Sequence, residues 1–350
     1  MRPRRGTLQP GRGSKLGHNP AMDDRQLLAR LAAGPCSGDA LARAAGISRA
    51  AVWKRIEALR AAGLAISARA GSGYALEQPL DLLDAAALEA AVSPAARAEL
   101  AALDTAWVID STNAELLRRS TPMRGSAVLL AERQTGGRGR RGRTWSSPLA
   151  AHLYLSLARH FGGGLARLGG LSLVAGVASV EALHALGHAD VRLKWPNDLV
   201  VADTPDAGLR KLGGLLVEGG GEHGGPVRAV IGLGLNVRMP VAFACEIDQP
   251  WCDLAMLGEA RSRNAIAAVV LSHLLPALAE FDRDGLEPFL ARYATLDALA
   301  GRAVTLHLHD GIVNAVAEGI APDGALRVRL DDGAVRMLHS GEVSVRVARA

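Results

Sequence analysis

Residues 127–145 read AVLLAERQTGGRGRRGRTW, an apolar run that leads directly into a loop of glycines and arginines. The run 127–131 predicts a buried strand. From Arg133 to Pro148 the chain has five arginines and no acidic residue to neutralise them. Glycine lets backbone N–H groups approach an anion closely, and the forked arginine side chain matches phosphate and carboxylate oxygens. The loop therefore predicts an anionic ligand, and alone it fits a nucleotide substrate and a nucleic acid equally well.

The charge of the chain is local rather than general. The 350 residues carry a net charge of +5, with a pI near 9.5. The first 21 residues hold five basic residues and no acidic one, so the remainder is neutral overall. Residues 1–22 are rich in proline and glycine and lack an apolar run. We expect a disordered basic extension there, not a secretory signal, with Met22 as a candidate natural start.

The cysteine count and the apolar runs indicate a cytoplasmic protein. Cys36, Cys245 and Cys252 are odd in number and lack the spacing of metal ligands, which favours a reducing compartment over a disulfide framework. No apolar stretch reaches the ~18 residues that a membrane span needs. We therefore expect no membrane association.

Residues 23–78 predict a winged helix-turn-helix. A short helix over 39–45 is followed by a Gly46-Ile47 turn, and Ser48 is placed to cap a second helix that runs to Ala62. A hairpin with a glycine-containing tip then forms the wing. Two helices joined by a tight turn are typical of DNA binding, but they also occur as packing or dimerisation hairpins.

The second helix separates an apolar stripe from a basic face. Val52, Ile56 and Leu59 recur at i, i+4 and i+7, which predicts one buried stripe. The predicted DNA contacts are Ser48, Arg49, Ala50, Trp53 and Lys54.

Residues 79–299 predict a central α+β domain, and residues 300–350 predict a small all-β domain. The expected helices of the central domain are 84–102 and 171–186, and the expected strands are 127–131, 153–157, 191–194, 215–218 and 229–233. In the last 50 residues, Asp-Gly pairs separate alternating runs, which is a strong hairpin signal.

Four further polar motifs lie in the central region. They are IDSTN (109–113), KWPND (194–198), KLGG (211–214) and GLGLN (232–236), each at the start or end of a predicted strand. Thr112 and Glu115 also fit a capping box. Taken singly, these motifs fit helix capping and turns as well as a ligand site.

In this order, the motifs resemble those of the bacterial bifunctional biotin–protein ligase and biotin operon repressor. The resemblance rests on IDSTN, GGRGRRGRTW, KWPNDL, KLGGLLVE and GLGLN, behind the helix-turn-helix SRAAVWKRIEALRAAG, and it runs from about residue 25 to 347. A C-terminal SGEVS (340–344) extends it. The resemblance implies an α+β protein with three parts: a winged helix-turn-helix, a mixed-sheet ligase domain related to class II synthetases, and a C-terminal small β-barrel.

The family makes biotinyl-5′-AMP from biotin and ATP and transfers biotin to one lysine of a carrier protein, such as the biotin carboxyl carrier of acetyl-CoA carboxylase. The resemblance implies ATP and Mg²⁺ as cofactors, operator DNA as a partner, and a homodimer in the adenylate-bound state, with the adenylate as corepressor. Three alternatives are a ligase whose helix-turn-helix no longer represses, a regulator without ligase activity, and a lipoate–protein ligase.

The resemblance also implies roles for individual residues. Catalytic roles fall on Arg138, Arg140, Lys194, Asp198 and Lys211. Biotin contacts fall on Ser111, Thr112, Asn113, Gln134, Arg138, Gly139, Arg140 and Lys211. Contacts to ATP or its adenine fall on Arg140, Arg141, Arg143, Asn236 and Trp251. Mg²⁺ is expected to be held through the phosphates, with Asp198 as the one candidate protein ligand.

Two positions depart from the pattern of the family. His152 stands where an asparagine is common in the strand after the loop, and Trp53 replaces a typically polar residue of the recognition helix.

Overall fold

The computed structural model describes residues 23–69, 71–164, 168–202, 208–221, 227–258, 261–308, 311–339 and 344–347. The predicted basic extension, residues 1–22, lies outside this set, as does the SGEVS motif except for its last residue. The chain divides into two compact units, one ending at Pro79 and one beginning at Leu80, with Ala61–Ala65 grouped with the second.

The first unit is the predicted winged helix-turn-helix. Its elements are α1 Asp24–Ala32, α2 Gly38–Ala45, α3 Arg49–Ala61, β1 Ile66–Arg69 and β2 Gly73–Leu76. Gly46 ends α2 in the left-handed conformation at φ 64°, where a side chain would be strained. The hydroxyl of Ser48 accepts a hydrogen bond from the Ala51 amide at 3.2 Å, as a helix cap does. The antiparallel strands β1 and β2 form the wing.

Helix α3 has the two faces that the sequence predicts. Val52, Ile56 and Leu59 are at most 3% exposed and lie in the core of the unit. The predicted DNA contacts are all exposed, namely Ser48, Arg49, Ala50, Trp53 and Lys54. The side chain of Trp53 is 54% exposed, whereas tryptophan side chains are mostly buried in folded proteins.

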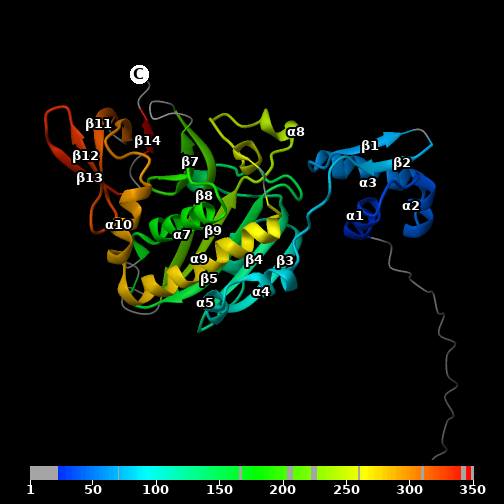
Figure 1. Cartoon of the computed structure of the whole chain (residues 1–350), viewed down its shortest axis with the longest axis horizontal. Coiled ribbons are helices and arrows are strands. Elements are labelled where there is room, and N and C mark those ends of the chain that lie inside the picture. Colours follow the sequence, from blue (N-terminus) through cyan, green and yellow to red (C-terminus); the bar gives the residue numbers. More distant parts are fainter. Residues whose placement is uncertain are drawn as a thin grey trace, which may run out of the picture. The chain divides into compact units, whose positions relative to one another are not determined.

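The second unit is built on a seven-stranded mixed sheet with the order β3-β4-β5-β9-β8-β7-β6 (Figure 1). Its strands are β3 Leu100–Ile109, β4 Ser126–Gln134, β5 Leu153–Phe161, β6 Arg192–Lys194, β7 Asp198–Ala202, β8 Leu209–Gly221 and β9 Val227–Leu235. Only β3 and β4 are parallel; the other neighbours are antiparallel. The ends of β3, β4 and β9 therefore share one edge with the start of β5.

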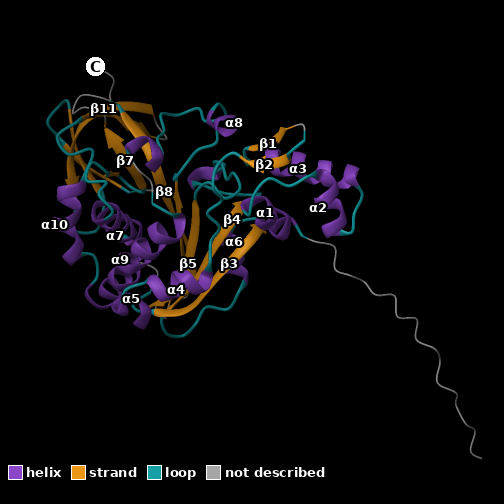
Figure 2. Cartoon of the chain, turned by 45° about the vertical axis from the view of Figure 1, so that its right-hand side comes forward, coloured by secondary structure: helices purple, strands orange, loops and turns teal. Residues whose placement is uncertain are grey.

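Helices cover both faces of this sheet (Figures 1 and 2). The main helices are α4 Ala85–Ala91, α5 Pro94–Ala98, α6 Thr112–Arg118, α7 Leu171–Ala185, α9 Arg263–Asp284 and α10 Glu287–Leu296. Short turns are α8 Val241–Ala244, η1 Arg140–Gly142 and η3 Leu254–Leu257. Helices α7 and α9 pack over the face that carries Leu155 and Leu157, and α6 packs over the opposite face through Leu116.

Helix α9 is long and apolar enough to cross a membrane by length and composition, alone among the described helices. Its apolar side chains, including Leu271, Leu274 and Phe281, are at most 1% exposed and belong to the core. Packing in the core therefore accounts for its apolar character.

Two predictions about helices are wrong. The single helix expected over 84–102 is two short helices followed by strand β3, because Ser93 caps a new helix with Pro94 at its first position. The capping box expected at Thr112 is absent, because Ser111 is the N-cap of α6 and accepts from the Ala114 amide.

The C-terminal strands form the predicted all-β part, a five-stranded antiparallel sheet with the order β13-β12-β11-β10-β14. The strands are β10 Ala303–Leu308, β11 Gly311–Ile320, β12 Leu326–Leu330, β13 Val335–Leu338 and β14 Ser344–Val347. Asp323 and Asp332 each bind the amide two residues further on, which shapes the Asp-Gly turns. The indole of the buried Trp195 donates to the Gly324 carbonyl at 3.0 Å and ties the two sheets together.

A buried ion pair fixes the start of the second unit. The Glu132 carboxylate lies 2.7 Å from the Arg263 guanidinium, and both side chains are at most 5% exposed. Glu132 also accepts from the Leu83 amide at 2.6 Å, and Arg263 donates to the Asp81 carbonyl. These bonds satisfy the buried charged groups except for the Arg263 Nε, and they hold residues 81–83 against β4.

His152, which stands where an asparagine is common in the family, accepts a hydrogen bond that an asparagine side chain could also accept. Its Nδ1 accepts from the Val237 amide at 3.0 Å, and Nε2 lies 3.4 Å from the sulfur of Met239. Complete burial lowers the pKa of His152 to about 3, so the imidazole is neutral in the folded protein.

We expect the lowered pKa of His152 to make the protein less stable in acid. The unfolded chain takes up a proton on this imidazole below about pH 6.5 while the folded protein stays neutral, so stability falls as the pH drops from 6.5 toward 3. His152→Asn keeps an acceptor for Val237 and removes the titration. Urea unfolding at pH 7 and pH 5 should show wild type losing about 2 kcal/mol more than the variant. Equal losses would contradict this assignment.

Candidate active site at one edge of the central sheet

The polar motifs of the sequence converge on the shared edge of the seven-stranded sheet. Residues 111–113 follow β3 and begin α6, Gln134 ends β4, and Asn236 follows β9. Lys194 ends β6 and pairs directly with Asp198 at the start of β7. The register of the sheet thus brings together motifs that are more than 100 residues apart in the chain.

A buried polar network lies under this edge. The Gln134 Oε1 accepts from the Thr112 amide at 2.9 Å and faces the Thr112 hydroxyl at 3.1 Å. The Ser156 hydroxyl lies 2.7 Å from Thr112 Oγ1 and donates to the Asn113 Oδ1 at 2.6 Å. Ser111, Thr112, Asn113 and Ser156 are all at most 4% exposed. The network holds donors and acceptors in fixed directions, as recognition of a polar ring requires.

The arginine loop is a short hairpin. The Trp145 amide donates to the Gly137 carbonyl at 2.9 Å, and the Gly139 amide donates to the Arg143 carbonyl at 2.7 Å. Between these bonds Arg138 pairs with Thr144. The tip is the turn η1, in which Arg141 has a φ of 58°, a left-handed conformation that is uncommon outside glycine. Arg141 and Arg143 are exposed.

Three cations of the site have neighbours within the protein. The Lys211 Nζ lies 2.6 Å from the Asp198 carboxylate, and the Arg138 guanidinium lies 3.1 Å from that of Glu218. The Arg140 Nη1 donates to the Asn197 Oδ1 at 3.1 Å. Partial burial lowers the pKa of Arg140, while the charge of Asp198 opposes this shift. Arginine stays charged despite such a shift, so the edge presents concentrated positive charge.

Glycines make room for the site on β9. A Cβ on Gly232 would lie 2.3 Å from Asn113 Oδ1, and one on Gly234 would lie 2.5 Å from the ring of Trp145. That ring also lies 5.6 Å from the Lys211 Nζ, within reach of a cation–π interaction. The spacing of the GLGLN motif therefore leaves one face of β9 open to the site.

Two residues assigned to the adenine lie beside Lys211. Trp251 pairs with Lys211 as an isolated bridge, and the Lys211 amide donates to the Pro250 carbonyl at 2.9 Å. Asn236 is 5% exposed, and its side-chain amide donates to the Cys252 carbonyl at 3.0 Å.

Four residues of the site were given no individual role on the basis of the sequence. They are Trp145, Ser156, Asn197 and Glu218. Trp145, Asn197 and Glu218 lie within or beside motifs that the sequence analysis did find. Ser156 lies in the apolar strand β5, on the face opposite to Leu155 and Leu157. Its polarity is the only sequence signal that could have indicated a role in the site.

The residues of the site do not form a metal centre by themselves. No group of three or more potential His, Cys, Asp or Glu ligands occurs among the described residues. Asp198, the one predicted ligand, is already engaged by Lys211. The described cysteines are all free thiols.

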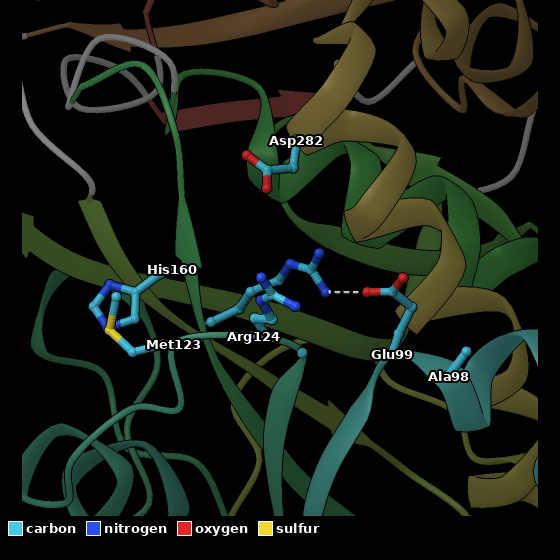
Figure 3. Close-up of a pocket in the computed structure, with 8 residues that line it drawn as sticks. Ala98, Glu99, Met123, Arg124, His160 and Asp282 are labelled. Atoms are coloured by element: carbon cyan, nitrogen blue, oxygen red, sulfur yellow. Dashed lines mark hydrogen bonds and ion pairs between the residues drawn. The ribbon is translucent and has the colours of Figure 1, made fainter.

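Two cavities lie at different places on the central sheet. One of about 300 Å³ is lined by Arg140 of the loop together with Ser172, Leu215 and Val217. The other, of about 340 Å³, lies at the opposite edge, where Arg159 faces Glu99 with 2.7 Å between their charged atoms (Figure 3). The second cavity contains none of the residues that the sequence analysis assigned to the site.

Comparison with known proteins agrees with this arrangement. Residues 106–236 match the biotin/lipoate A/B protein ligase family, residues 300–346 the biotin protein ligase C-terminal domain, and residues 24–75 a helix-turn-helix domain. The biotin protein ligase from Aquifex aeolicus, solved in complex with biotin and ATP, is 26% identical with a TM-score of 0.59. The similarity covers 71% of this chain and 100% of that one.

Two relatives match nearly the whole chain. The bifunctional ligase/repressor BirA of Salmonella typhimurium is 40% identical over 89% of this chain and 93% of its own length. The protein of the same name from Escherichia coli is 39% identical over 92% and 97%. Because similarity at this level extends across the helix-turn-helix, the ligase domain and the C-terminal sheet, the chain belongs to the bifunctional ligase/repressor family of biotin protein ligases.

Proposed function

We propose that this chain joins biotin to ATP, giving biotinyl-5′-AMP and pyrophosphate, and then transfers biotin to a lysine of a biotin carboxyl carrier protein. The observation that carries this proposal is the convergence of Arg138, Arg140 and Lys211 on the same edge as the Thr112–Gln134 network. Activation of a carboxylate by ATP brings two anions together, and a preorganised group of cations offsets their repulsion.

The buried network is the proposed biotin pocket. Ser111, Thr112 and Gln134 surround the place of the ureido ring, and Gly139 exposes loop backbone to it. Because both polar atoms of the Asn113 side chain already have protein partners, its proposed role is to shape the pocket from behind.

The cations act at the other end of biotin. A biotin carboxylate oxygen attacks the α-phosphorus, a P–O bond forms, and the bond to pyrophosphate breaks. We assign Lys211 and Arg140 to the carboxylate and the α-phosphate, where they offset the developing charge, and Lys194 to the neighbouring phosphates. Asp198 is assigned to the Mg²⁺ that these phosphates would carry, because a carboxylate alone repels them. We assign Arg141 and Arg143 to the phosphates, and Asn236 and Trp251 to the adenine.

The second step needs orientation more than new chemistry. The neutral amine of the carrier lysine attacks the acyl carbon of the mixed anhydride, an amide bond forms, and AMP leaves with the electron pair of the broken C–O bond. The proton lost from the amine nitrogen passes to solvent. The enzyme must shield the adenylate from water and direct the amine, which the arginine hairpin can do by closing over the site. Mg²⁺ would arrive on the ATP phosphates, and we assign no step to it.

The first unit supports regulation by DNA binding. We propose that residues 23–78 bind operator DNA through the exposed face of α3, that residues 79–299 are the ligase domain, and that residues 300–350 complete it. We also propose cytoplasmic location and homodimerisation in the adenylate-bound state. The adenylate acts as corepressor if it binds the dimer-competent state more tightly than the monomer.

Arg140→Gly should release the adenylate prematurely. Loss of a charge-assisted contact to the loop weakens retention of the anion by roughly tenfold, so free biotinyl-AMP acylates lysines of other proteins. Serum albumin incubated with the enzyme, biotin and ATP, and blotted with streptavidin, measures this labelling. Arg124→Gly, an exposed arginine at the opposite edge of the sheet, is the matched control. Labelling confined to the carrier protein would refute the role of the loop as a lid.

A mobility shift with biotin-synthesis promoter DNA near 150 mM salt should show binding only when biotin and ATP are both present, because adenylate formation drives dimerisation. Lys54→Ala and Trp53→Asn should each weaken binding by about tenfold, since both side chains are exposed on α3. Arg25→Ala, on α1, is the control and should bind like wild type. Absence of any specific shift would leave a ligase whose first unit does not repress.

A further inference from the structure

Glu218 connects the arginine hairpin to the buried network. Its Oε2 accepts from the Asn113 side-chain amide at 2.9 Å. The Arg138 Nη2 lies 3.1 Å from Oε1 and 3.3 Å from Oε2 of the same carboxylate. One side chain near the end of β8 therefore contacts both the start of α6 and the base of the loop.

The inner contact of Glu218 is rigid. Asn113 is 4% exposed, and its amide also donates to the Leu216 carbonyl at 3.2 Å. Its oxygen accepts from Ser156, and Gly232 lies close behind it. A carboxylate held by Asn113 thus has a fixed position relative to the sheet.

The outer contact of Glu218 is with the arginine hairpin. Arg138 is 48% exposed on its side chain, and its backbone pairs with Thr144 across the hairpin. Fixing the Arg138 side chain therefore fixes the entry of the whole hairpin, including Gly139 and the turn that carries Arg140. Glu218 is 25% exposed, so the pair is partly screened from water.

We propose that Glu218 is a positioning residue that anchors Arg138 and thereby sets the arginine hairpin over the Thr112–Gln134 pocket. The role in ligation rests on the proposed function, because a hairpin so placed retains the adenylate. The other carboxylate of the site, Asp198, faces Lys211 at the proposed phosphate end. Anionic substrate replaces the contact of Lys211 with Asp198, whereas the contact of Arg138 with Glu218 persists.

Glu218→Gln separates the two contacts. The amide oxygen of glutamine still accepts from Asn113, but the attraction for the Arg138 guanidinium is lost. Partly exposed ion pairs of this kind change an equilibrium by about two- to fivefold. We expect a loosened hairpin with an intact pocket.

Limited proteolysis tests the anchor without any catalysis. Trypsin cleaves after arginine, and the hairpin offers Arg138, Arg140, Arg141 and Arg143. In ligand-free protein, Glu218→Gln should be cut in this loop about two- to fivefold faster than wild type, at an unchanged melting temperature. The matched control is Glu318→Gln, which removes another partly buried carboxylate paired with arginines, in the C-terminal sheet. It should be cut like wild type.

A double-mutant cycle identifies the partner. Arg138→Gln should accelerate cleavage at Arg140 to a similar extent, and the double variant should be no faster than either single one. If the wild-type protein ligates biotin as proposed, Glu218→Gln should also raise the KM for biotin and increase the labelling of albumin, while kcat changes less. If Glu218→Gln lowers the melting temperature, Glu218→Asp, which keeps the charge at shorter reach, replaces it in the same assays.

Equal cleavage of wild type and Glu218→Gln, or additive effects in the cycle, would overturn the anchor. Failure of the proposed ligase function gives a different result, because the wild-type protein would then form no biotinyl-AMP. The cleavage rates of the ligand-free variants would still test the contact between Glu218 and Arg138.

Discussion

The accumulation of positive charge at one edge of the central sheet is the constraint on which the site depends. Arg138, Arg140 and Lys211 lie at this edge, and each has a polar neighbour of the protein within 3.1 Å. Without ligand, these neighbours offset the repulsion among the cations. In the proposed reaction, Lys211 and Arg140 face a carboxylate and a phosphate that would otherwise repel each other, while Arg138 keeps its contact with Glu218. The positive charges, which repel one another in the empty site, thus stabilise the anionic groups in the proposed reaction.

The topology of the sheet supplies this edge. Because β3 and β4 run parallel and β9 is antiparallel to β5, residues from IDSTN, the arginine hairpin and GLGLN meet at one place. Glycines at 232 and 234 leave space for Asn113 and Trp145 there. Trp195 of the KWPND turn donates to the Gly324 carbonyl, which links the C-terminal sheet to the part of the site that contains Lys194 and Asp198. The architecture therefore accounts for the wide separation of the motifs in sequence.

Much of this arrangement could be predicted from residue patterns. The stripe of Val52, Ile56 and Leu59, the wing and the arginine loop are local features, and the structure confirms them. Contacts between distant segments could not be predicted. The bonds of Ser156 to Asn113 and of Glu218 to Arg138 depend on strand register, which no short window of sequence records. The break at Ser93-Pro94 was missed because the alanine-rich segment favours one continuous helix, although proline and a cap start a new one.

A crystal structure of the protein with a nonhydrolysable analogue of biotinyl-5′-AMP would show whether this edge of the sheet binds the adenylate. We expect the ureido ring to lie against Thr112 and Gln134 and the phosphate between Lys211 and Arg140. The hairpin should close over both, with Arg138 still on Glu218. An analogue bound at the opposite edge, beside Arg159 and Glu99, or one held without contact to the hairpin, would contradict it.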